Sequence, residues 1–406
     1  MSTDAALAWY RGGVRLANLD YVVDMMAMPC VKCRVMSIAP FVRTCDDAYH
    51  RHCGTGKEST MKATVYHGNH TVALDEVPDP VIESSTDAIV DIEYAGVCGS
   101  DLWTYRDQGA AAPNRIGHEF VGTVRAVGSE VHTVKPGDWV MVPFRYSDGT
   151  CMYCRHGLES SCVNGGFWGR NTADAGQGEA ARVPYADGTL VKAYEDGRRP
   201  DESLMASLLT LTDVFTTGYH AAYCAGVKPG DIVVVVGDGA VGLSAIMAAK
   251  LLGASCVINA GSTHEDRHRL AREFGADQIV TVRGDEAVQA VHELTGGEMC
   301  DAVLECVGSA QSFATSIKMA TPGGKVSYVG LPHGVSLDLA AMFPTNVTIT
   351  GGISPARHYM SMVLNDVLSG KINPGLVYTK EYALGDIAQA YDDMDHRRTI
   401  KALIRV

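Results

Sequence analysis

The sequence lacks the features by which membrane, secreted and nucleic-acid-binding proteins are recognised. No apolar run reaches the roughly 18 residues that a membrane-spanning helix needs. The N-terminus has no basic stretch followed by a long apolar one, which is the pattern of a secretion signal. Basic residues are few: 34 Lys and Arg oppose 47 Asp and Glu, the formal net charge is -13, and no Lys/Arg cluster offers a local exception. Such a charge repels phosphate backbones and anionic lipid, so the sequence predicts a cytoplasmic protein whose partners are neither nucleic acid nor membrane.

The composition is that of an ordinary globular protein. The chain has 406 residues, of which 46% are hydrophobic and 20% charged, and this predicts two or three domains. A change of pattern falls at Met61, where apolar and polar residues begin to alternate. Residues 1–60 show no sustained period and are expected to be an unstructured or spurious extension. The alternative is a small zinc module around Cys30 and Cys33, although the Cys/His spacings match none of the common finger patterns.

Three regions are expected after this change of pattern. Residues 61–217 consist of short alternating runs punctuated by Gly and Pro, which predicts mainly β structure. Over 218–351, strand-like runs such as DIVVVVG alternate with helical segments of about 10 to 15 residues. This alternation predicts a parallel sheet covered by helices on both faces, which is a doubly wound domain. Residues 352–406 are expected to return to the first domain.

A glycine-rich turn joins the first strand and the first helix of the doubly wound region. Gly237, Gly239 and Gly242 form a G-x-G-x-x-G motif that follows the valine-rich strand directly and opens the helix. There the first glycine makes the tight turn, the second lets a pyrophosphate approach the backbone, and the third lets the helix pack on the strand. The unpaired N–H groups at the helix start face the phosphate. We therefore expect a dinucleotide to bind at this turn and to contact Ala240 and Val241 as well as the three glycines.

The tip of the second strand bears on which dinucleotide binds. A carboxylate that binds the ribose of NAD is expected about 20 residues after the glycines. The chain instead has Ser262, Thr263 and His264 there, followed by Arg267. Small hydroxyl and basic side chains accommodate a 2′-phosphate better than an acid does. NADP is therefore favoured over NAD, the alternative being that an acid at 265–266 turns back to the ribose.

The chain has twelve cysteines, and in a cytoplasmic protein these indicate metal ligands or buried thiols more than disulfides. Cys98, in CGSD, and His118, in GHE, offer the thiolate and imidazole that zinc takes in catalytic sites, where three protein ligands leave one position open. Cys151, Cys154 and Cys162 follow with the spacing of metal ligands. The last four cysteines of the chain lie in apolar runs, and we expect them to be small buried hydrophobes.

Five motifs occur in order between Met61 and Val406: CGSD, GHE, DGTCMYCRHGLESSC, TDVFTTGYH and GDGAVG. Together they resemble the zinc-dependent medium-chain dehydrogenase/reductase superfamily, specifically the alcohol dehydrogenase group and its formaldehyde-dehydrogenase-like and secondary-alcohol branches. The resemblance implies an α/β fold with a GroES-like, mainly β catalytic domain and a doubly wound Rossmann cofactor domain. It also implies zinc-dependent hydride transfer between a small alcohol or aldehyde (or ketone) and NADP(H) or NAD(H). Relatives form dimers or tetramers, so a homo-oligomer is expected.

The resemblance implies roles for individual residues. Cys98, His118 and Asp213 correspond to the ligands of a catalytic zinc, and an Asp at the third position is what the formaldehyde-dehydrogenase-like branch shows. Glu119 corresponds to a carboxylate that lies beside these ligands or exchanges with them. Ser100 is placed like the hydroxyl residue that passes the proton of the alcohol outward.

Two further positions follow from the same resemblance. Thr217 matches a family position beside the nicotinamide. Trp103 stands where many relatives extend the proton relay with a histidine, and an indole cannot relay a proton. We expect Trp103 either to wall the substrate pocket or to belong to the core.

The cysteine-rich stretch departs from the family pattern at its first position. Relatives often close a structural zinc with four cysteines, whereas here Asp148 precedes Cys151, Cys154 and Cys162. Three thiolates and one carboxylate complete a four-coordinate zinc site. The alternatives are an empty lobe or a disulfide between two of the cysteines.

Two other functions stay open. Within the superfamily the alternative is a polyol or sugar dehydrogenase, although no Glu-Pro ligand motif lies near position 213. In a different class, the chain could be a non-catalytic nucleotide-binding relative. A non-catalytic relative is expected to have lost its zinc ligands. The Cys, His and Asp residues at these positions therefore argue against this alternative.

Overall fold

The computed structural model describes residues 59–108, 111–169, 174–261 and 263–406. The expectations for the N-terminal extension concern residues that lie, but for its last two, outside this description, and so does Ser262. Within the described ranges, no helix is long and apolar enough to cross a membrane.

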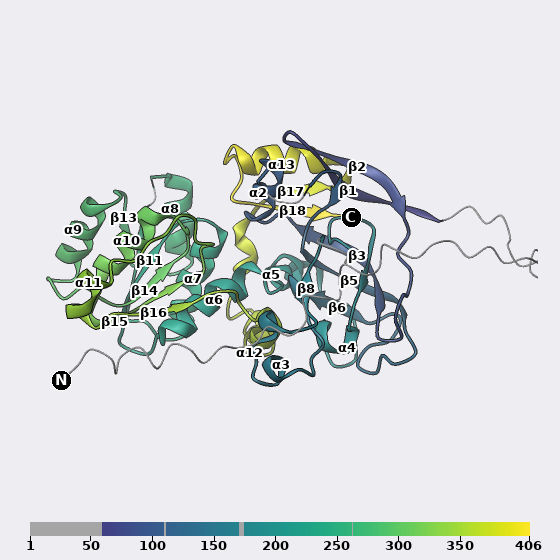
Figure 1. Cartoon of the computed structure of the whole chain (residues 1–406), viewed down its shortest axis with the longest axis horizontal. Helices are drawn as coiled ribbons and strands as arrows, with labels where there is room; N and C mark the ends of the chain where they lie inside the picture. The colour runs from purple at the N-terminus through teal and green to yellow at the C-terminus, as the bar shows by residue number, and fades with distance from the viewer. Residues whose placement is uncertain (1–58, 109–110, 170–173, 262) are drawn as a thin grey trace, which may run out of the picture. The chain divides into compact units, whose positions relative to one another are not determined.

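The described chain opens with a β-hairpin (Figure 1). β1 (Thr60–Gly68) and β2 (Thr71–Pro78) pair antiparallel, as the alternation that starts at Met61 predicts. Asn69 and His70 connect the two strands with positive φ angles of 51° and 56°. This is the backbone of a two-residue hairpin turn whose twist matches that of the strands.

A seven-stranded sheet is the centre of the mainly β region. Its strands are β3 (Ala88–Gly96), β5 (Glu119–Val127), β6 (Trp139–Val142), β9 (Ala180–Val183), β10 (Val191–Lys192), β17 (Tyr378–Ala383) and β18 (Lys401–Arg405). Their order is β10-β6-β5-β3-β18-β17, and β9 also pairs with β3. β18 runs antiparallel to β3, with Leu403 opposite Gly96, so the C-terminal strand lies beside the strand that leads to Cys98.

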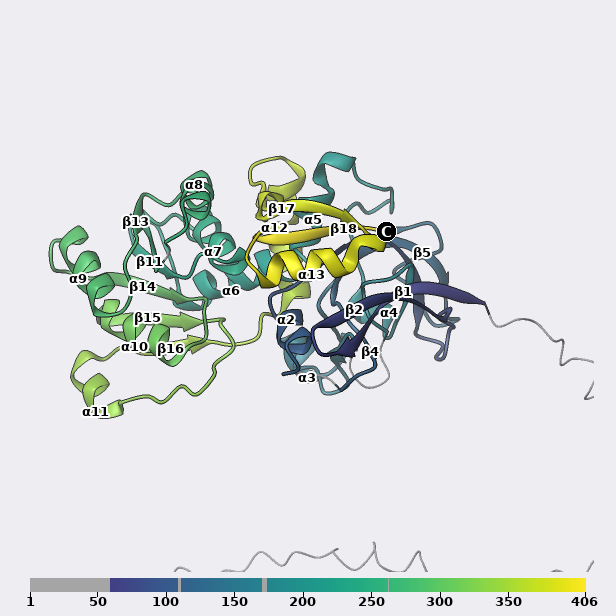
Figure 2. The same ribbon diagram turned by 90° about the horizontal axis from the view of Figure 1, so that it is seen from above.

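Short elements surround this sheet: α2 (Asp101–Tyr105), β4 (Asn114–Arg115), β7 (Arg145–Tyr146), α3 (Met152–Arg155), η1 (Glu159–Ser161), β8 (Gly166–Phe167), α4 (Ala186–Thr189), η2 (Glu202–Leu204), α5 (Met205–Thr210), η4 (Pro374–Val377), η5 (Leu384–Asp386) and α13 (Ile387–Asp395). Figure 2 shows α13 beside β17 and β18. Its Ile387 and Tyr391 are buried in one apolar cluster with Phe120 and Ile404 of the sheet. This packing fixes the β3–β18 pair from one side.

The second sheet has six strands that are all parallel. They are β11 (Ile232–Val236), β12 (Cys256–Ala260), β13 (Gln278–Val280), β14 (Cys300–Glu305), β15 (Ala320–Tyr328) and β16 (Thr348–Gly351), in the order β13-β12-β11-β14-β15-β16. The associated helices are α6 (Val214–Ala225), α7 (Ala240–Leu251), α8 (Glu265–Glu273), α9 (Asp285–Leu294), α10 (Ala310–Met319), α11 (Leu339–Met342), η3 (Phe343–Thr345) and α12 (Ala356–Leu368). The order reverses next to β11, where the glycine-rich turn lies.

Different helices cover the two faces of this sheet (Figures 1 and 2). Successive side chains of a strand point to opposite faces. In β11, Val233 and Val235 pack with buried residues of α6, α7 and α8, whereas Val234 and Val236 pack with residues of α9 and α10. Because both faces are covered, the strand is a continuous β-branched run and not an alternating one. The predicted doubly wound domain is confirmed.

One helix boundary differs from the sequence prediction. The helix expected over SAQSFATSIKMATPGG ends at Met319, and β15 begins at Ala320. Pro322 has no backbone N–H, and its ring disfavours the helical conformation in Thr321. The proline therefore ends the helix earlier than the apolar periodicity suggests.

Candidate active site

A cleft of about 660 Å³ is lined by residues of both the mainly β region and the doubly wound region. Cys98 lies in it two residues after the end of β3, His118 directly before β5, and Asp213 directly before α6. The three residues that the resemblance implies as zinc ligands thus come from three separate segments and meet in one place.

The donor atoms of these residues lie close together. Oδ2 of Asp213 is 3.3 Å from Sγ of Cys98 and 3.1 Å from Nε2 of His118. With Glu119, the group offers four potential ligand atoms that all lie within 4.8 Å of one another. A chelating arrangement of this kind, in which Cys98 is only 9% exposed, has the geometry of a metal site.

Asp213 occupies a position at which its carboxylate would ordinarily cap a helix. It is the residue before α6, where Asp is favoured because its side chain accepts from the first backbone N–H groups. No such bond is formed. Oδ2 faces Cys98 and His118 instead, and Oδ1 accepts a hydrogen bond from Oγ1 of Thr217 at 3.1 Å. The carboxylate therefore contacts side chains of the cleft and does not cap the helix.

Charge–charge interactions in the cluster shift its pKa values. Burial alone would raise the pKa of Asp213, but His118 and Lys401 lower it to about 2. Burial and the charge of Asp213 raise the pKa of the Cys98 thiol to about 11. Burial opposes protonation of His118, yet Asp101 and Cys98 raise its pKa well above 6.5. The pocket therefore favours positive charge, which is the condition for binding a cation.

Asp101 is a residue of this site to which the sequence analysis gave no role. Its Oδ1 lies 3.1 Å from Nδ1 of His118, and its Oδ2 accepts from the backbone N–H of Cys98 at 3.0 Å. A carboxylate that holds one imidazole nitrogen leaves the other one to face a metal. The sequence feature that could have identified Asp101 is its place in the CGSD motif, three residues after Cys98.

Glu119 is held by two residues that the sequence analysis did not identify. Its Oε1 is 2.6 Å from Nζ of Lys401, and its Oε2 accepts from the hydroxyl of Tyr378 at 3.1 Å. All three groups lie near Cys98, but Lys401 and Tyr378 come from the C-terminal strands β18 and β17. No local sequence signal links them to Glu119.

The donor set fits zinc. Zinc bonds of about 2.0–2.3 Å to N, O and S ligands in a tetrahedron place neighbouring ligand atoms roughly 3.3–3.8 Å apart. The distances of 3.1 and 3.3 Å from Asp213 to His118 and Cys98 are close to that range. One thiol, one imidazole and one carboxylate would leave a fourth coordination position open, as the three protein ligands of catalytic zinc sites do.

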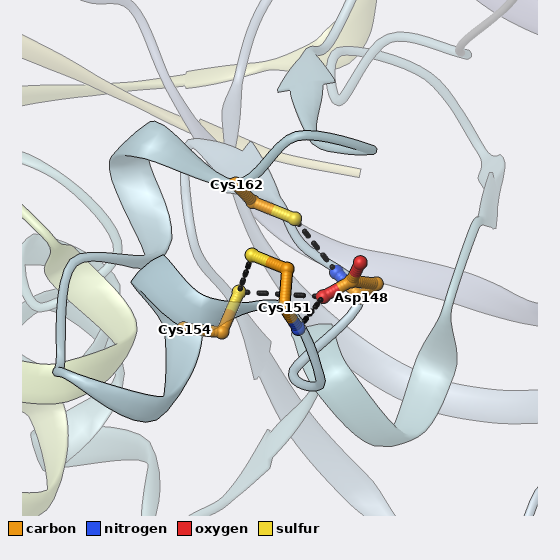
Figure 3. A group of neighbouring side chains, drawn as sticks. All are labelled: Asp148, Cys151, Cys154 and Cys162. Carbon is orange, nitrogen blue, oxygen red and sulfur yellow. Dashed lines mark hydrogen bonds between the residues drawn. The ribbon is translucent and has the colours of Figure 1, made fainter.

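The cysteine-rich lobe forms a second cluster (Figure 3). The Sγ atoms of Cys151 and Cys154 are 3.5 Å apart, and Oδ1 of Asp148 lies 3.4 Å from Sγ of Cys154. Sγ of Cys162 accepts from the backbone N–H of Asp148 at 3.2 Å. The four ligand atoms lie within 4.8 Å of one another. This arrangement also fits a tetrahedral zinc, and all three cysteines are free thiols.

The glycine-rich turn has the backbone that a dinucleotide needs. Gly237 adopts a φ of 118°, which L side chains rarely adopt. A Cβ on Gly242 would lie 2.4 Å from the carbonyl oxygen of Gly237, so only glycine permits this contact between helix and strand. Around Gly239 there is open space on the side where a Cβ would stand, and Gly239, Ala240 and Val241 line the cleft. The turn therefore leaves room for a pyrophosphate at the start of α7.

A second cavity, of about 270 Å³, lies over the tips of β11 and β12. Its lining includes His264 and Arg267, two of the residues expected near the 2′-phosphate, and also Arg283 and Arg397, which were not expected there. Thr263 is not among its lining residues. Sequence position alone identified the basic residues next to the second strand, whereas the other two arginines follow β13 and α13.

Two features of this cavity bear on the dinucleotide. Arg267 forms an ion pair with Asp238 at 3.2 Å. One of the basic side chains of the cavity therefore already has a carboxylate partner. Nε of Arg283 donates to the carbonyl oxygen of Gly261 at 2.9 Å, directly beside the second strand tip. The acids at 265–266 lie in the first turn of α8, and the side chain of Glu265 is 90% exposed.

The remaining predicted residues also line the cleft. Oγ of Ser100 is 3.4 Å from Nε2 of His118, and Thr217 lies one helical turn after Asp213. Trp103 lines the same cleft, so of its two expected roles the pocket wall is the one that its position supports.

Comparison with known proteins gives the family. The chain matches the models of the alcohol dehydrogenase GroES-like domain over residues 84–194 and of the zinc-binding dehydrogenase over residues 240–369. It is 33% identical to a zinc-type alcohol dehydrogenase B of Aspergillus flavus over 358 residues, which cover 86% of this chain and 82% of that protein. It is 29% identical to a glutathione-independent formaldehyde dehydrogenase of Bacillus subtilis, over 84% of this chain and 96% of that one.

Solved structures agree with the sequence comparison. An alcohol dehydrogenase from a Thermus species superposes with a TM-score of 0.79 at 32% identity and covers 85% of this chain and all of that one. The chain belongs to the zinc-dependent medium-chain dehydrogenase family, as its five motifs predict. It is a zinc-dependent alcohol dehydrogenase that uses a nicotinamide cofactor, with a GroES-like and a Rossmann-type domain, and formaldehyde-dehydrogenase-like proteins are among its relatives.

Proposed function

We propose that Cys98, His118 and Asp213 hold the catalytic zinc and that Ser100 and Glu119 act beside it. The observation that carries this proposal is the approach of Asp213 to both other donors, at 3.1 and 3.3 Å, in a cleft that also contains the glycine-rich turn. Three donors from distant segments leave one coordination position for a substrate oxygen. The reaction is the interconversion of a small alcohol with its aldehyde or ketone.

The residues of the chain bind, orient and move the proton. Bound zinc supplies Lewis-acid polarisation of the substrate oxygen, and the nicotinamide supplies a hydride acceptor or donor. Asp101 engages Nδ1 of His118 and so leaves Nε2 as the atom that would bind the metal. Oγ of Ser100 accepts the proton of the alcohol while its own hydroxyl proton passes to water, to which Ser100 is exposed. Thr217, which lines the same cleft, would lie beside a bound nicotinamide.

We further propose NADP as the preferred cofactor, with the pyrophosphate on Gly237, Gly239, Ala240, Val241 and Gly242. The basic lining of the second cavity supports this preference. His264, Arg267, Arg283 and Arg397 surround it, against the single carboxylate of Asp238. A 2′-phosphate gains charge-assisted hydrogen bonds there.

The lobe is proposed to hold a structural zinc on Asp148, Cys151, Cys154 and Cys162. Its thiolates must stay reduced, which supports the cytoplasm as the place where the enzyme works. This assignment is supported by the three thiol groups and one carboxylate, whose ligand atoms lie within 4.8 Å of one another.

The domain boundaries and the assembly are also proposals. The pairing of β18 with β3 supports a division into 61–217, 218–351 and a returning segment 352–406. A dimer or a tetramer is supported by β16, which is an edge strand of the six-stranded sheet, together with Leu339 and Phe343, which are 69% and 86% exposed. Unpaired strand edges and exposed apolar groups are favourable places for a second copy. Sedimentation equilibrium measures the state directly.

A metal assay combined with an absorbance screen tests the function. Purified full-length protein should contain about two zinc ions per chain. When a small alcohol or aldehyde is turned over, the absorbance of NADPH or NADH should rise or fall as the cofactor is reduced or oxidised. A metal-free, inactive protein that still binds the dinucleotide would instead identify the non-catalytic relative. Turnover of sugars and polyols alone would identify the alternative enzyme within the superfamily.

A further inference from the structure

The indole of Trp103 stacks on the imidazole of His333. The ring centroids are 4.1 Å apart, and the planes make an angle of 25°. Trp103 lies in α2, the turn that follows Cys98, whereas His333 lies in the segment that follows β15. The contact therefore joins the mainly β region to the doubly wound region at the cleft.

The backbone fixes both members of this pair. The N–H of Trp103 donates to the carbonyl oxygen of Ser100 at 3.2 Å, and its own carbonyl oxygen accepts from the N–H of Gln108 at 2.8 Å. The N–H of His333 donates to the carbonyl oxygen of Gly308 at 2.9 Å. Because each ring is carried by an anchored segment, the stack holds Trp103 in one orientation beside the turn that carries Cys98 and Ser100.

We call three aromatic residues that line the cleft, Trp103, Phe144 and Phe167, its aromatic wall. Phe144, which is buried, and Phe167 line the same cleft. The ring of Phe144 makes an edge contact with that of His118 at 6.4 Å, and its centroid is 5.8 Å from that of Phe167. One member of the wall, Phe144, therefore contacts a proposed zinc ligand.

Several charged side chains along the cleft already have partners. Arg106 pairs with Asp395 at 2.6 Å, and Lys401 pairs with Glu119 at 2.6 Å. Arg267, on the cofactor side, pairs with Asp238. Hydroxyl groups of a polyol would therefore compete with existing ion pairs, whereas an apolar group gains contact with the aromatic wall.

We propose that Trp103, positioned by His333, walls the substrate site and selects alcohols and aldehydes that carry a bulky apolar group over polyhydroxylated or very small ones. His333 is a positioning residue, because it acts through the indole. This inference rests on the proposed function, since it concerns the substrate of the same site.

The test compares kcat/KM for benzyl alcohol, ethanol and sorbitol in the zinc-loaded full-length enzyme. Wild type should favour benzyl alcohol about tenfold or more over each of the others. Trp103→Ala should lower this preference about tenfold, mainly through KM for benzyl alcohol, while zinc content and dinucleotide affinity stay unchanged. Trp103→Phe should keep most of the preference. The matched control is His292→Ala, which removes an exposed imidazole on α9.

His333 has its own readout. His333→Ala should raise KM for benzyl alcohol with little change in kcat, and should alter the tryptophan emission, because Trp103 loses its stacking partner. His333→Phe, which can stack, should restore both. A wild type that turns over alcohols without this preference, or a Trp103→Ala enzyme that retains it, would overturn the inference and leave the proposed function intact. A protein without zinc and without turnover of any alcohol would overturn both.

Discussion

Nζ of Lys401 lies 2.6 Å from Oε1 of Glu119, and the two side chains are 1% and 0% exposed. The hydroxyl of Tyr378 donates to the other oxygen of this carboxylate at 3.1 Å, and Nζ also donates to the carbonyl oxygen of Val97 at 3.1 Å. The buried pair therefore has hydrogen-bond partners for both charges. Such a pair holds Glu119 next to the donors of the proposed zinc site while engaging both of its oxygens.

The first prediction concerns stability. Lys401→Met should lower the free energy of unfolding by about 3–5 kcal/mol, because it leaves the carboxylate of Glu119 buried without its counter-charge. The double variant with Glu119→Gln should recover most of that loss. Denaturant unfolding of each variant measures the effect. The control is Lys250→Met, whose partner Asp277 is 42% exposed, and it should cost less than about 1 kcal/mol.

The second prediction separates two carboxylates. Asp213→Ala should lose most of the catalytic zinc and nearly all turnover, because Asp213 approaches both Cys98 and His118, while binding of the dinucleotide survives. Glu119→Gln should retain the metal and lose activity only in part, since both oxygens of Glu119 already have partners. Zinc analysis alongside turnover decides between them. Loss of zinc from the Glu119 variant with retention in the Asp213 variant would exchange the two roles.

Much of the doubly wound fold could be predicted because its signals are local. The valine run of β11 indicates a strand covered on both faces, and the glycines at 237, 239 and 242 mark the turn that follows it. The end of α10 at Met319 was missed because the apolar period continues past it, although Pro322 cannot belong to the helix. The sequence prediction followed the apolar periodicity of the segment and not the restriction that Pro322 places on the backbone.

The candidate site was less accessible to the sequence. Cys98, His118 and Asp213 came from motifs that resemble a family, and the structure brings their donor atoms together. Lys401 is 282 residues from Glu119, and a single lysine in the apolar run TIKALIRV carries no signal of burial. Pairing of β18 with β3 is what places it there. Arg283 was missed for the same reason, because its position depends on β13 lying beside β12.

The third prediction concerns acid. His220 is buried, with Nδ1 2.9 Å from the hydroxyl of Tyr359, and burial lowers its pKa to about 4 from an ordinary 6.5. The unfolded chain therefore binds a proton that the folded chain resists. The stabilising contribution is complete above pH 6.5 and declines as pH falls from 6.5 towards 4, by up to roughly 3 kcal/mol.

His220→Gln should remove this part of the pH dependence, because an amide does not titrate. The measurement is the free energy of unfolding of both proteins at several pH values between 7 and about 4. The exposed His292→Gln variant should follow the wild-type curve. Parallel curves for wild type and His220→Gln would show that His220 does not resist protonation in the folded state.

The last prediction concerns the cofactor. Arg283 is anchored to the carbonyl oxygen of Gly261 at 2.9 Å and lines the same cavity as His264 and Arg267. If this cavity takes a 2′-phosphate, Arg283→Ala should weaken NADPH binding about tenfold, equivalent to about 1.4 kcal/mol, and leave NADH binding nearly unchanged. Titration of each reduced dinucleotide measures both affinities. Arg272→Ala, an exposed residue near the end of α8, is the matched control.

Ser262→Asp completes the cofactor test at the position where a ribose-binding acid is expected. The new carboxylate should repel a 2′-phosphate and accept a hydrogen bond from an unmodified ribose. The ratio of kcat/KM for NADP to that for NAD should therefore exceed one in the wild type and fall below one in this variant. A wild type that prefers NAD tenfold, about 1.4 kcal/mol, would show that Asp238 or an acid at 265–266 governs the cavity and that its arginines serve another anion.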